Sequence, residues 1–572
     1  MKASDFIATF LEKKGVTHVF ELSGGMITHL LDSLNQKTAI NIITMHHEQS
    51  AAFAADAFGR VTGIPGVALA TSGPGATNLL TGIGSCYFDS TPAIFITGQV
   101  NRHEQKGERP VRQLGFQETD IIAMAKPVTK ACFKIESEHD LPKVLEDAFR
   151  IATEGRPGPV LIDVPMDVQR AQIEPSHEVE SNSEPVILLH DQMQKMIVDI
   201  EKAERPLLLV GRGVRAAFAI REMNAFLEKT EIPVVTTLLA VDAIAHDNLL
   251  RFGFIGSYGN RWANIAFGEC DLLIVVGSRL DIRQTGADVK FFENRTIYHV
   301  DCEAGEINNR VKGCIPLVMD ARQFFIDFNN TARDISFKRP DMWFDYVNGL
   351  KEQWPDTKEL EPKGINPNIF MHKLSHNSRV AKCYVADVGS HQMWAAQSVE
   401  LYEDQLFLTS AGMGAMGYAL PAGIGASFAL GIKPVIVIAG DGCMQINIQE
   451  LQTIVRNKLP VKIVIMNNKN LGMIRQFQDS YFESRYQSTY WGYSAPDFQK
   501  VAEAYGISSM TIVEQTEIDD AVRWMWNEAN ADKPILLQVM IDPHTNTYPK
   551  IAFGKPITEM EPFAKPIEME ST

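Results

Sequence analysis

The chain has 572 residues, with 54 Lys and Arg against 70 Asp and Glu, a net charge of −16, and 45% hydrophobic residues. At roughly 150 residues per domain, this length predicts three or four domains with ample apolar material for several cores. The negative charge and the absence of a Lys/Arg-rich block in the sequence argue against a nucleic-acid-binding protein. Because only 22% of the residues are charged and apolar residues are spread throughout, a disordered chain is also excluded.

The cysteines and apolar runs indicate the kind of compartment. Seven cysteines are scattered without a CxxC pair, so neither a disulfide framework nor a thiolate zinc site is expected. Residues 1–14 predict an amphipathic helix and not a signal peptide. The apolar run 418–440 contains Lys433 and several prolines and glycines, which predicts a buried helix followed by a strand. We therefore expect a cytoplasmic enzyme that uses small molecules and binds neither nucleic acid nor a membrane.

Short β-rich runs alternate with helical stretches along the whole chain, which is typical of parallel sheets with helices on both faces. The sequence predicts an α/β fold of three doubly wound parallel-sheet domains. A Glu/Ser/Pro-rich stretch at 171–190 has the composition of a linker, and a polar stretch separates the second and third units. The expected domains are residues 1–172, 190–335 and 366–550.

The strongest chemical signal lies in the third unit. Gly440-Asp441-Gly442 follows the apolar run 435–438, and Asn467-Asn468 follows the run 461–466. Each fragment alone is more often a turn, but both stand at carboxyl ends of predicted strands, where open α/β sheets bind ligands. A carboxylate and an amide oxygen suit Mg²⁺ or Ca²⁺, and Gly442 would let phosphates approach a helix N-terminus. The pair predicts a metal–phosphate site.

This pairing resembles the Gly-Asp-Gly and Asn-Asn motif of thiamine-diphosphate enzymes. The resemblance implies that Asp441, Asn468 and the carbonyl of Asn470 hold Mg²⁺ against the cofactor's diphosphate. It also implies further cofactor contacts, from Ser390, His391, Gly442, Cys443 and Met473, although relatives often have serine at the position of Cys443.

The resemblance also assigns residues to the other end of the cofactor. Glu48 matches the family's catalytic glutamate, which activates the aminopyrimidine; alone it would more often be a first-turn helix residue. The segment Gly412–Gly417 formally matches GxGxxG, a weak dinucleotide pattern. In the resembled family it places a wedge residue, Met416, under the bent cofactor and offers the carbonyl of Gly414. Since Glu48 and the metal site lie in different domains, a homodimer or homotetramer is implied.

Over essentially the whole chain, the resemblance is closest to acetolactate synthase (acetohydroxyacid synthase) catalytic subunits. The supporting segments are 72–78, 97–100, 115–118, 155–160, 391–397 and 471–476. Such enzymes decarboxylate pyruvate or a similar 2-oxo acid and pass the two-carbon unit to a second carbonyl compound. Phe116 and Gln117 would line the active site.

The middle unit resembles the flavin-binding domain of the same group, which implies FAD as a third cofactor. The corresponding residues are Arg156, Gly211, Gly213, Arg279, Asp281, Arg283, Asp301 and Glu303. Cations beside the two phosphates of FAD make physical sense. A glycine turn after a strand is common, however, so a relic domain without flavin is the alternative.

Several positions depart from the pattern of this group, and some of them shape the acceptor pocket in relatives. They are Ser23, Asn101, Met166, Ile255, Ile282 and Phe477. The acceptor is therefore open: a second 2-oxo acid, or a ketone or keto-sugar. A flavin oxidoreductase of the pyruvate-oxidase type is a further alternative, whereas a catalytically silent partner subunit is disfavoured by the intact Glu48, Asp441 and Asn468.

Overall fold

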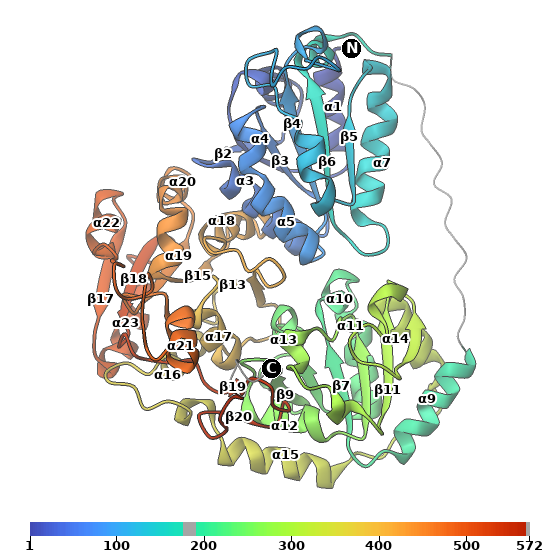
Figure 1. Ribbon diagram of the computed structural model, residues 1–572, viewed down its shortest axis with the longest axis vertical. Coiled ribbons are helices and arrows are strands. Elements are labelled where there is room, and N and C mark those ends of the chain that lie inside the picture. Colours follow the sequence, from blue (N-terminus) through green and yellow to red (C-terminus); the bar gives the residue numbers. More distant parts are fainter. Residues whose placement is uncertain (175–189, 568–572) are drawn as a thin grey trace.

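The computed structural model describes residues 1–174 and 190–567, which contain three six-stranded parallel sheets flanked by helices (Figure 1). The predicted α/β class with three doubly wound parallel sheets is confirmed. Central strands such as β10 (Leu272–Val276) are buried along their whole length, as expected of a parallel sheet covered on both faces. The linker predicted at 171–190 falls mostly outside the described residues.

The N-terminal sheet has the strand order β2-β1-β3-β4-β6-β5. Its strands are β1 (His18–Leu22), β2 (Asn41–Thr44), β3 (Gly66–Ala70), β4 (Ala93–Gln99), β5 (Ala131–Lys134) and β6 (Pro159–Pro165). Its helices are α1 (Ala3–Lys13), α2 (Thr28–Lys37), α3 (Glu48–Thr62), α4 (Pro74–Asn78), α5 (Leu80–Phe88), α6 (Ile121–Ala125), α7 (Leu141–Thr153) and α8 (Met166–Arg170).

The middle sheet has the order β12-β11-β10-β7-β8-β9, which is the 3-2-1-4-5-6 arrangement of dinucleotide-binding folds. Besides β10, its strands are β7 (Pro206–Val210), β8 (Val234–Thr236), β9 (Arg251–Phe254), β11 (Thr296–Asp301) and β12 (Ile315–Val318). The helices are α9 (His190–Lys202), α10 (Arg212–Ala216), α11 (Ile220–Thr230), α12 (Arg261–Glu269), α13 (Ile282–Thr285) and α14 (Ala321–Thr331). The polar stretch after this unit contains α15 (Asp341–Gln353).

The third sheet has the order β14-β13-β15-β16-β18-β17, the same topology as the N-terminal one. Its strands are β13 (Cys383–Ala386), β14 (Leu406–Thr409), β15 (Val435–Gly440), β16 (Val461–Asn467), β17 (Ser508–Ile512) and β18 (Ile535–Met540). The helices are α16 (Pro367–His376), α17 (Ser390–Ser398), α18 (Ala419–Ala429), α19 (Asp441–Ile446), α20 (Leu451–Arg456), α21 (Gly472–Tyr481), α22 (Phe498–Ala504) and α23 (Ile518–Met525). The buried helix and strand expected within 418–440 are α18 and β15.

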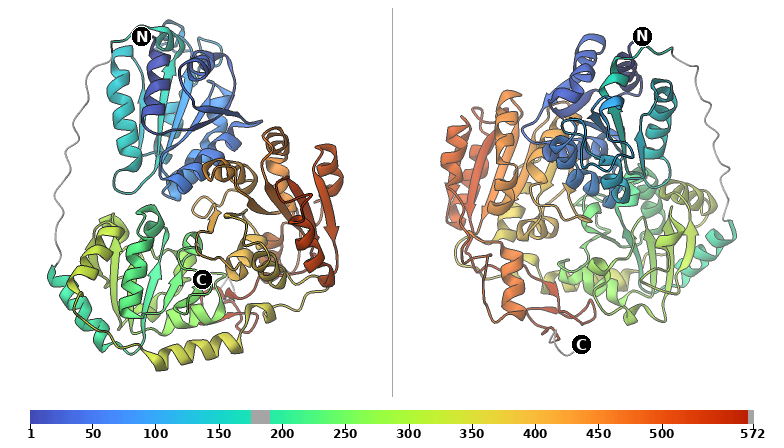
Figure 2. Two further views of the ribbon diagram at one scale, coloured as in Figure 1. Left: turned by 180° about the vertical axis from the view of Figure 1, so that it is seen from behind. Right: turned by 45° about the horizontal axis from the view of Figure 1, so that its top comes forward.

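The N-terminal and third domains share a core. Helix α18 packs along α3 (Figures 1 and 2). One cluster of buried side chains spans both domains. At its edge the ring of Phe428 lies 5.1 Å from that of His18 and 6.3 Å from that of Phe20, centre to centre. The first and third domains are thus fixed relative to each other by burial of apolar surface.

The C-terminal segment folds back onto the middle domain. It forms the short antiparallel pair β19 (Lys550–Ile551) and β20 (Met560–Glu561) beside β9 and α12 (Figure 1). The buried guanidinium of Arg261 forms an ion pair with Glu359 at 2.6 Å and donates to the backbone carbonyls of Met560 and Glu561. In the part of the chain that the structure describes, no helix is long and apolar enough to cross a membrane.

Candidate active site

The predicted metal ligands meet at the carboxyl edge of the third sheet. Strands β15 and β16 are paired, with Gly440 beside Met466, so the residues that follow them are neighbours. Asp441 begins α19 directly after β15, and Asn468 follows β16. The strand order reverses between β13 and β15, which is the point where open α/β sheets bind ligands.

Three oxygens converge there. The carboxamide oxygen of Asn468 lies 2.8 Å from the carbonyl oxygen of Asn470 and 3.2 Å from Asp441 Oδ1. Neighbouring oxygens of a Mg²⁺ octahedron are about 3 Å apart, given bonds of about 2.0–2.1 Å. Rotating the Asn468 amide would turn both contacts into hydrogen bonds instead. The oxygens therefore repel one another unless the amide turns or a cation lies between them, and the donor set fits Mg²⁺.

The second oxygen of Asp441 is held separately. The hydroxyl of Tyr493 donates to Asp441 Oδ2 at 3.1 Å. Burial raises the pKa of Asp441 to about 6, and a bound cation would favour its ionised form. Tyr493 was not predicted from the sequence, because it lies in an irregular segment before α22 that carries no motif.

Next to these oxygens lies a cradle for an anion, formed where α17 and α21 begin. Among the described residues, the buried hydroxyl of Ser390 has no hydrogen-bond partner. A methyl group on Gly472 would lie 2.9 Å from that hydroxyl and 2.7 Å from Asn468 Nδ2, so glycine is required to keep the space open. Free N–H groups at helix starts favour anions. The predicted Met473 follows Gly472 and packs against the core of the third domain.

His391 lies under this cradle. Its Nε2 accepts a hydrogen bond from the backbone N–H of Gly440 at 3.1 Å, and burial lowers the pKa of His391 to about 3. The imidazole is therefore neutral, and the accepting role of Nε2 assigns the proton to Nδ1. That N–H can donate a hydrogen bond to a phosphate oxygen.

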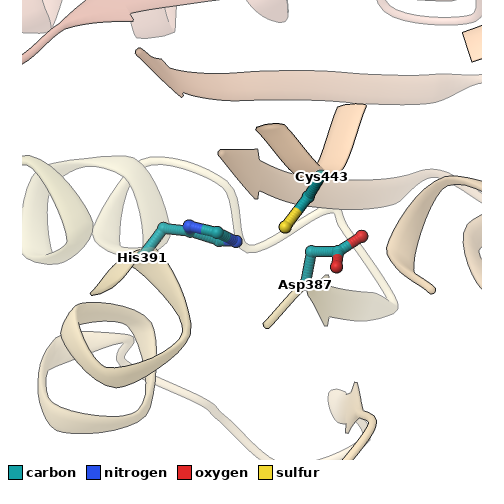
Figure 3. A group of neighbouring side chains, drawn as sticks. All are labelled: Asp387, His391 and Cys443. Atoms are coloured by element: carbon teal, nitrogen blue, oxygen red, sulfur yellow. The ribbon is translucent and has the colours of Figure 1, made fainter. Parts of the chain in front are cut away.

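Asp387, His391 and Cys443 form a compact cluster whose potential ligand atoms lie within 4.8 Å of one another (Figure 3). Such a set resembles a metal site. However, the carboxylate of Asp387 already accepts backbone hydrogen bonds at 2.8–2.9 Å, two of them from Gly417 and Ala419. The thiol of Cys443 donates to a backbone carbonyl 3.0 Å away, and burial raises its pKa well above the ordinary value. The cluster is therefore an internal support for the neighbouring loops.

Glu48 lies on the N-terminal domain as the first residue of α3. It is buried, and its Oε2 accepts a hydrogen bond from Asn78 at 2.9 Å. Gln117, whose φ is +66°, packs on Gly73, where a methyl group would lie 3.0 Å from its Cβ. Glu48, the segment 72–78 and Gln117 therefore share one edge of this domain.

The same edge is open to solvent in the single chain. Phe116, beside Gln117, has 79% of its surface exposed. Within the described residues, no hydrogen bond or ion pair joins Glu48 to Asp441 or Asn468. One chain thus carries two groups of predicted site residues, one around Glu48 and one around the metal ligands.

The loop 410–417 lies over the start of α19. A methyl group on Gly442 would lie 3.4 Å from the terminal methyl of Met416, so the predicted wedge residue contacts the Gly-Asp-Gly turn. Gly414 has a φ of +63°, a conformation that glycine adopts without strain.

A cavity of about 710 Å³ lies between the three domains, at the point where the order of the middle sheet reverses. A methyl group on Gly213 would lie 2.6 Å from the Cα of Gly277, so the turn after β7 must be glycine to reach β10 this closely. Six predicted residues line the cavity: Arg156, Gly213, Arg279, Asp281, Arg283 and Asp301. Its size, its cations and its place in the sheet fit a dinucleotide.

The other two predicted flavin residues lie off the lining. Gly211 packs behind it, where a methyl group would be 2.1 Å from the Gly277 carbonyl oxygen. Glu303 forms an ion pair with Arg156 at 2.9 Å. Asp281 also caps α13, since its carboxylate accepts the N–H of Arg283.

Three family models match consecutive parts of the chain. The thiamine pyrophosphate enzyme N-terminal TPP binding domain matches residues 1–124, the central domain matches 193–327, and the C-terminal TPP binding domain matches 387–539. Each match falls on one of the three sheets. The chain belongs to the thiamine pyrophosphate enzyme family.

Relatives within this family extend the similarity to the full length. The acetolactate synthase large subunit of Corynebacterium glutamicum is 36% identical over 98% of this chain and 90% of its own. The isozyme 2 large subunit of Escherichia coli is 35% identical over 98% and 99%, respectively. A probable acetolactate synthase large subunit of Methanocaldococcus jannaschii is 36% identical over 100% and 96%. The resemblance drawn from the sequence is confirmed.

As a member of the thiamine pyrophosphate enzyme family, the chain has one cofactor-binding domain at each end, with the set around Glu48 in the first and the anion cradle in the last. Arg212 was not predicted from the sequence, although it stands between two predicted glycines. It lines the cavity, and within the described part of the chain its buried Nε has no hydrogen-bond partner. Burial lowers the pKa of Arg212 to about 10. A bound anion would raise this pKa again, because it favours the charged guanidinium.

Proposed function

We propose that the protein is a thiamine-diphosphate-dependent carboligase of the acetolactate synthase type. It decarboxylates pyruvate and passes the remaining two-carbon unit to a second carbonyl compound. With pyruvate as acceptor, two pyruvate anions and one proton give one acetolactate and one CO₂. The observation that carries the proposal is the convergence of the Asp441, Asn468 and Asn470 oxygens beside the unpartnered hydroxyl of Ser390.

The third domain would hold the cofactor's diphosphate. Asp441, Asn468 and the Asn470 carbonyl would ligate Mg²⁺, while Ser390 and the Nδ1–H of His391 would donate to phosphate oxygens. Gly442 and Met473 would border the same site, with Cys443 supporting it from below. Thiamine diphosphate, when bound, supplies the carbon that adds to the 2-oxo acid and accepts the electrons left by CO₂.

The chain's own residues would orient and activate that cofactor. Glu48 would hold or give a proton at the aminopyrimidine ring, and Met416 would support the bend between the two rings. The Gly414 carbonyl would accept a hydrogen bond from the pyrimidine amino group. Gln117 and Phe116 would border the substrate and exclude water from it.

The active site would be completed by a second copy of the chain. This assignment is supported by the exposed Phe116 and by the lack, among the described residues, of any hydrogen bond or ion pair between Glu48 and the metal ligands. It makes the enzyme a homodimer or homotetramer. The central cavity would hold FAD, with Arg156, Arg279 and Arg283 near the phosphates and Asp301 and Glu303 near the ribose. The domain limits 1–172, 190–335 and 366–550 and the cytoplasmic location belong to the same proposal.

The test is to incubate the full chain with thiamine diphosphate, Mg²⁺, FAD and pyruvate, offering a panel of 2-oxo acids, ketones and keto-sugars. Mass spectrometry then identifies the products. We expect acetolactate or its 2-oxo acid homologues. A product formed only with a keto-sugar, or reduction of oxygen without a carbon–carbon bond, would contradict the acetolactate synthase type.

A further inference from the structure

The start of the loop 410–417 is held by a carboxylate from a different domain. Asp89, which follows α5, is buried and accepts the backbone N–H groups of Ala411 at 3.1 Å and Gly412 at 2.7 Å. The approach is close: a methyl group on Gly412 would lie 2.7 Å from the Cβ of Phe88. The N-terminal domain thus binds the loop backbone directly.

Arg60, in the last turn of α3, fixes the orientation of that carboxylate. Its guanidinium donates to Asp89 at 2.9 Å and to the carbonyl of Thr409 at 2.8 Å, and its Nε lies 2.8 Å from Asp56. Burial alone would lower the pKa of Arg60, but Asp56 and Asp89 raise it well above the ordinary value. The arginine therefore stays charged. It holds both the carboxylate of Asp89 and the carbonyl of Thr409, the residue just before the loop.

The other end of the loop is held from its own domain. Asp387 accepts the N–H of Gly417 at 2.9 Å, and the carbonyl of Gly417 accepts from Asn447 at 2.8 Å. Between these anchors lie Gly414 and Met416. A shift at the Asp89 end must therefore be absorbed by the part of the loop that faces the Gly-Asp-Gly turn.

The same contact forms part of the wall of the central cavity. Asp89, Ala411 and Gly412 all line it. The loop is consequently shared between the site proposed for thiamine diphosphate and the cavity proposed for FAD.

We propose that Asp89, oriented by Arg60, is a positioning residue for the thiamine-diphosphate site and acts through the loop 410–417 without touching thiamine diphosphate or substrate. The inference rests on the proposed function. In Asp89→Asn, a carboxamide offers one oxygen and one NH₂ group in place of two oxygens, so one of the two loop N–H groups loses its acceptor and faces the NH₂ group. A displacement of about 1 Å at a reacting group can cost roughly 100-fold in rate.

The experiment compares full-length wild type and Asp89→Asn, each supplied with thiamine diphosphate, Mg²⁺ and FAD. We expect kcat to fall by roughly 10- to 100-fold with little change in the KM for pyruvate. Thiamine diphosphate should bind more weakly in calorimetry, and hydrogen exchange of a peptide covering 410–417 should speed up. Phe428→Leu is the control: it weakens the same interface between domains but does not contact the loop.

The inference is overturned if Asp89→Asn matches wild type in kcat, cofactor affinity and loop exchange, or if Phe428→Leu changes them equally. Should Asp89→Asn fail to fold, Arg60→Lys provides the same test, because it keeps the charge but not both hydrogen bonds; unchanged values there would overturn the inference. A wild-type chain that neither binds thiamine diphosphate nor consumes pyruvate overturns the proposed function as well, so the two failures are distinguishable.

Discussion

The carboxylate of Glu48 is buried at the start of α3 and accepts a hydrogen bond from Asn78 at 2.9 Å. A glutamine has the same shape and can keep that bond, but it cannot hold or release the carboxyl proton. We expect Glu48→Gln to lower kcat by roughly 10²–10⁴-fold while the chain still folds and binds Mg²⁺. CO₂ release measures this. Glu12→Gln, the same change on the exposed face of α1, should behave as wild type; a Glu48→Gln variant that does so contradicts the assignment.

Tyr493 donates a hydrogen bond to Oδ2 of Asp441, whose Oδ1 is the oxygen beside Asn468. Groups that orient a metal ligand typically contribute 10- to 100-fold to affinity. Tyr493→Phe should therefore weaken Mn²⁺ binding, taken as a probe for Mg²⁺, by about 10-fold in the presence of thiamine diphosphate. Free Mn²⁺ measured by electron paramagnetic resonance gives the affinity. Tyr490→Phe, in the same segment, is the control, and equal affinities for both variants would exclude this role for Tyr493.

At the scale of elements, the turn after β7 depends on the contact between Gly213 and Gly277. Gly213→Ala would place a methyl group 2.6 Å from the Cα of Gly277, so the strands must separate. We expect the free energy of unfolding to fall by about 1–3 kcal/mol. FAD binding should be lost as well. Gly349→Ala, on α15 where nothing in the described chain lies within 4 Å, should be neutral or stabilising. Thermal unfolding and flavin absorbance provide the measurement, and normal flavin content in Gly213→Ala would argue against the cavity as the FAD site.

Helix α16 is joined to the segment before it through His372. Its Nε2 lies 2.9 Å from Asp356 and its Nδ1 lies 3.2 Å from Glu400, with His246 and His376 also facing Glu400. Burial would lower the pKa of His372, but these carboxylates raise it to about 9. The stabilisation by protonated His372 is thus fully present below its ordinary pKa of 6.5 and is lost as the pH rises through about 9.

This pKa predicts a pH-dependent difference between wild type and His372→Gln. Wild type should be more stable near pH 6, by no more than about 3 kcal/mol, and the advantage should shrink as the pH approaches 9. Melting temperatures of both proteins at several pH values provide the test. An advantage that stays constant from pH 6 to 9 would contradict the raised pKa.

The elements show what a sequence can and cannot predict. Apolar runs such as 435–438 and 461–466 are found as β15 and β16, and their adjacency follows from one strand–helix–strand unit. Arg212 was not predicted, although it stands between two predicted glycines and lines the cavity. Tyr493 and Asp89 were not predicted, because each is hydrogen-bonded to a segment far away in the sequence. Those contacts depend on sheet order and domain packing, which cannot be predicted from the periodicity of apolar residues along the sequence.

At the scale of the whole molecule, a chain with a net charge of −16 is proposed to bind a diphosphate, a flavin and a 2-oxo acid, all of them anions. The total charge therefore says little about its ligands. Local positive groups offset the net negative charge where the anions are proposed to bind. They are Arg156, Arg212, Arg279 and Arg283 around the cavity, and the helix starts beside the proposed Mg²⁺ site.

The central claim is that thiamine diphosphate and Mg²⁺ enable this protein to join two carbonyl compounds after decarboxylation. The most direct measurement is the ratio of pyruvate consumed to CO₂ and acetolactate formed, with and without the two cofactors. We predict two pyruvates consumed for each CO₂ and each acetolactate, and no turnover once EDTA and gel filtration have removed Mg²⁺ and thiamine diphosphate. Equal amounts of pyruvate, CO₂ and acetaldehyde or acetate, or turnover that persists without the cofactors, would contradict it.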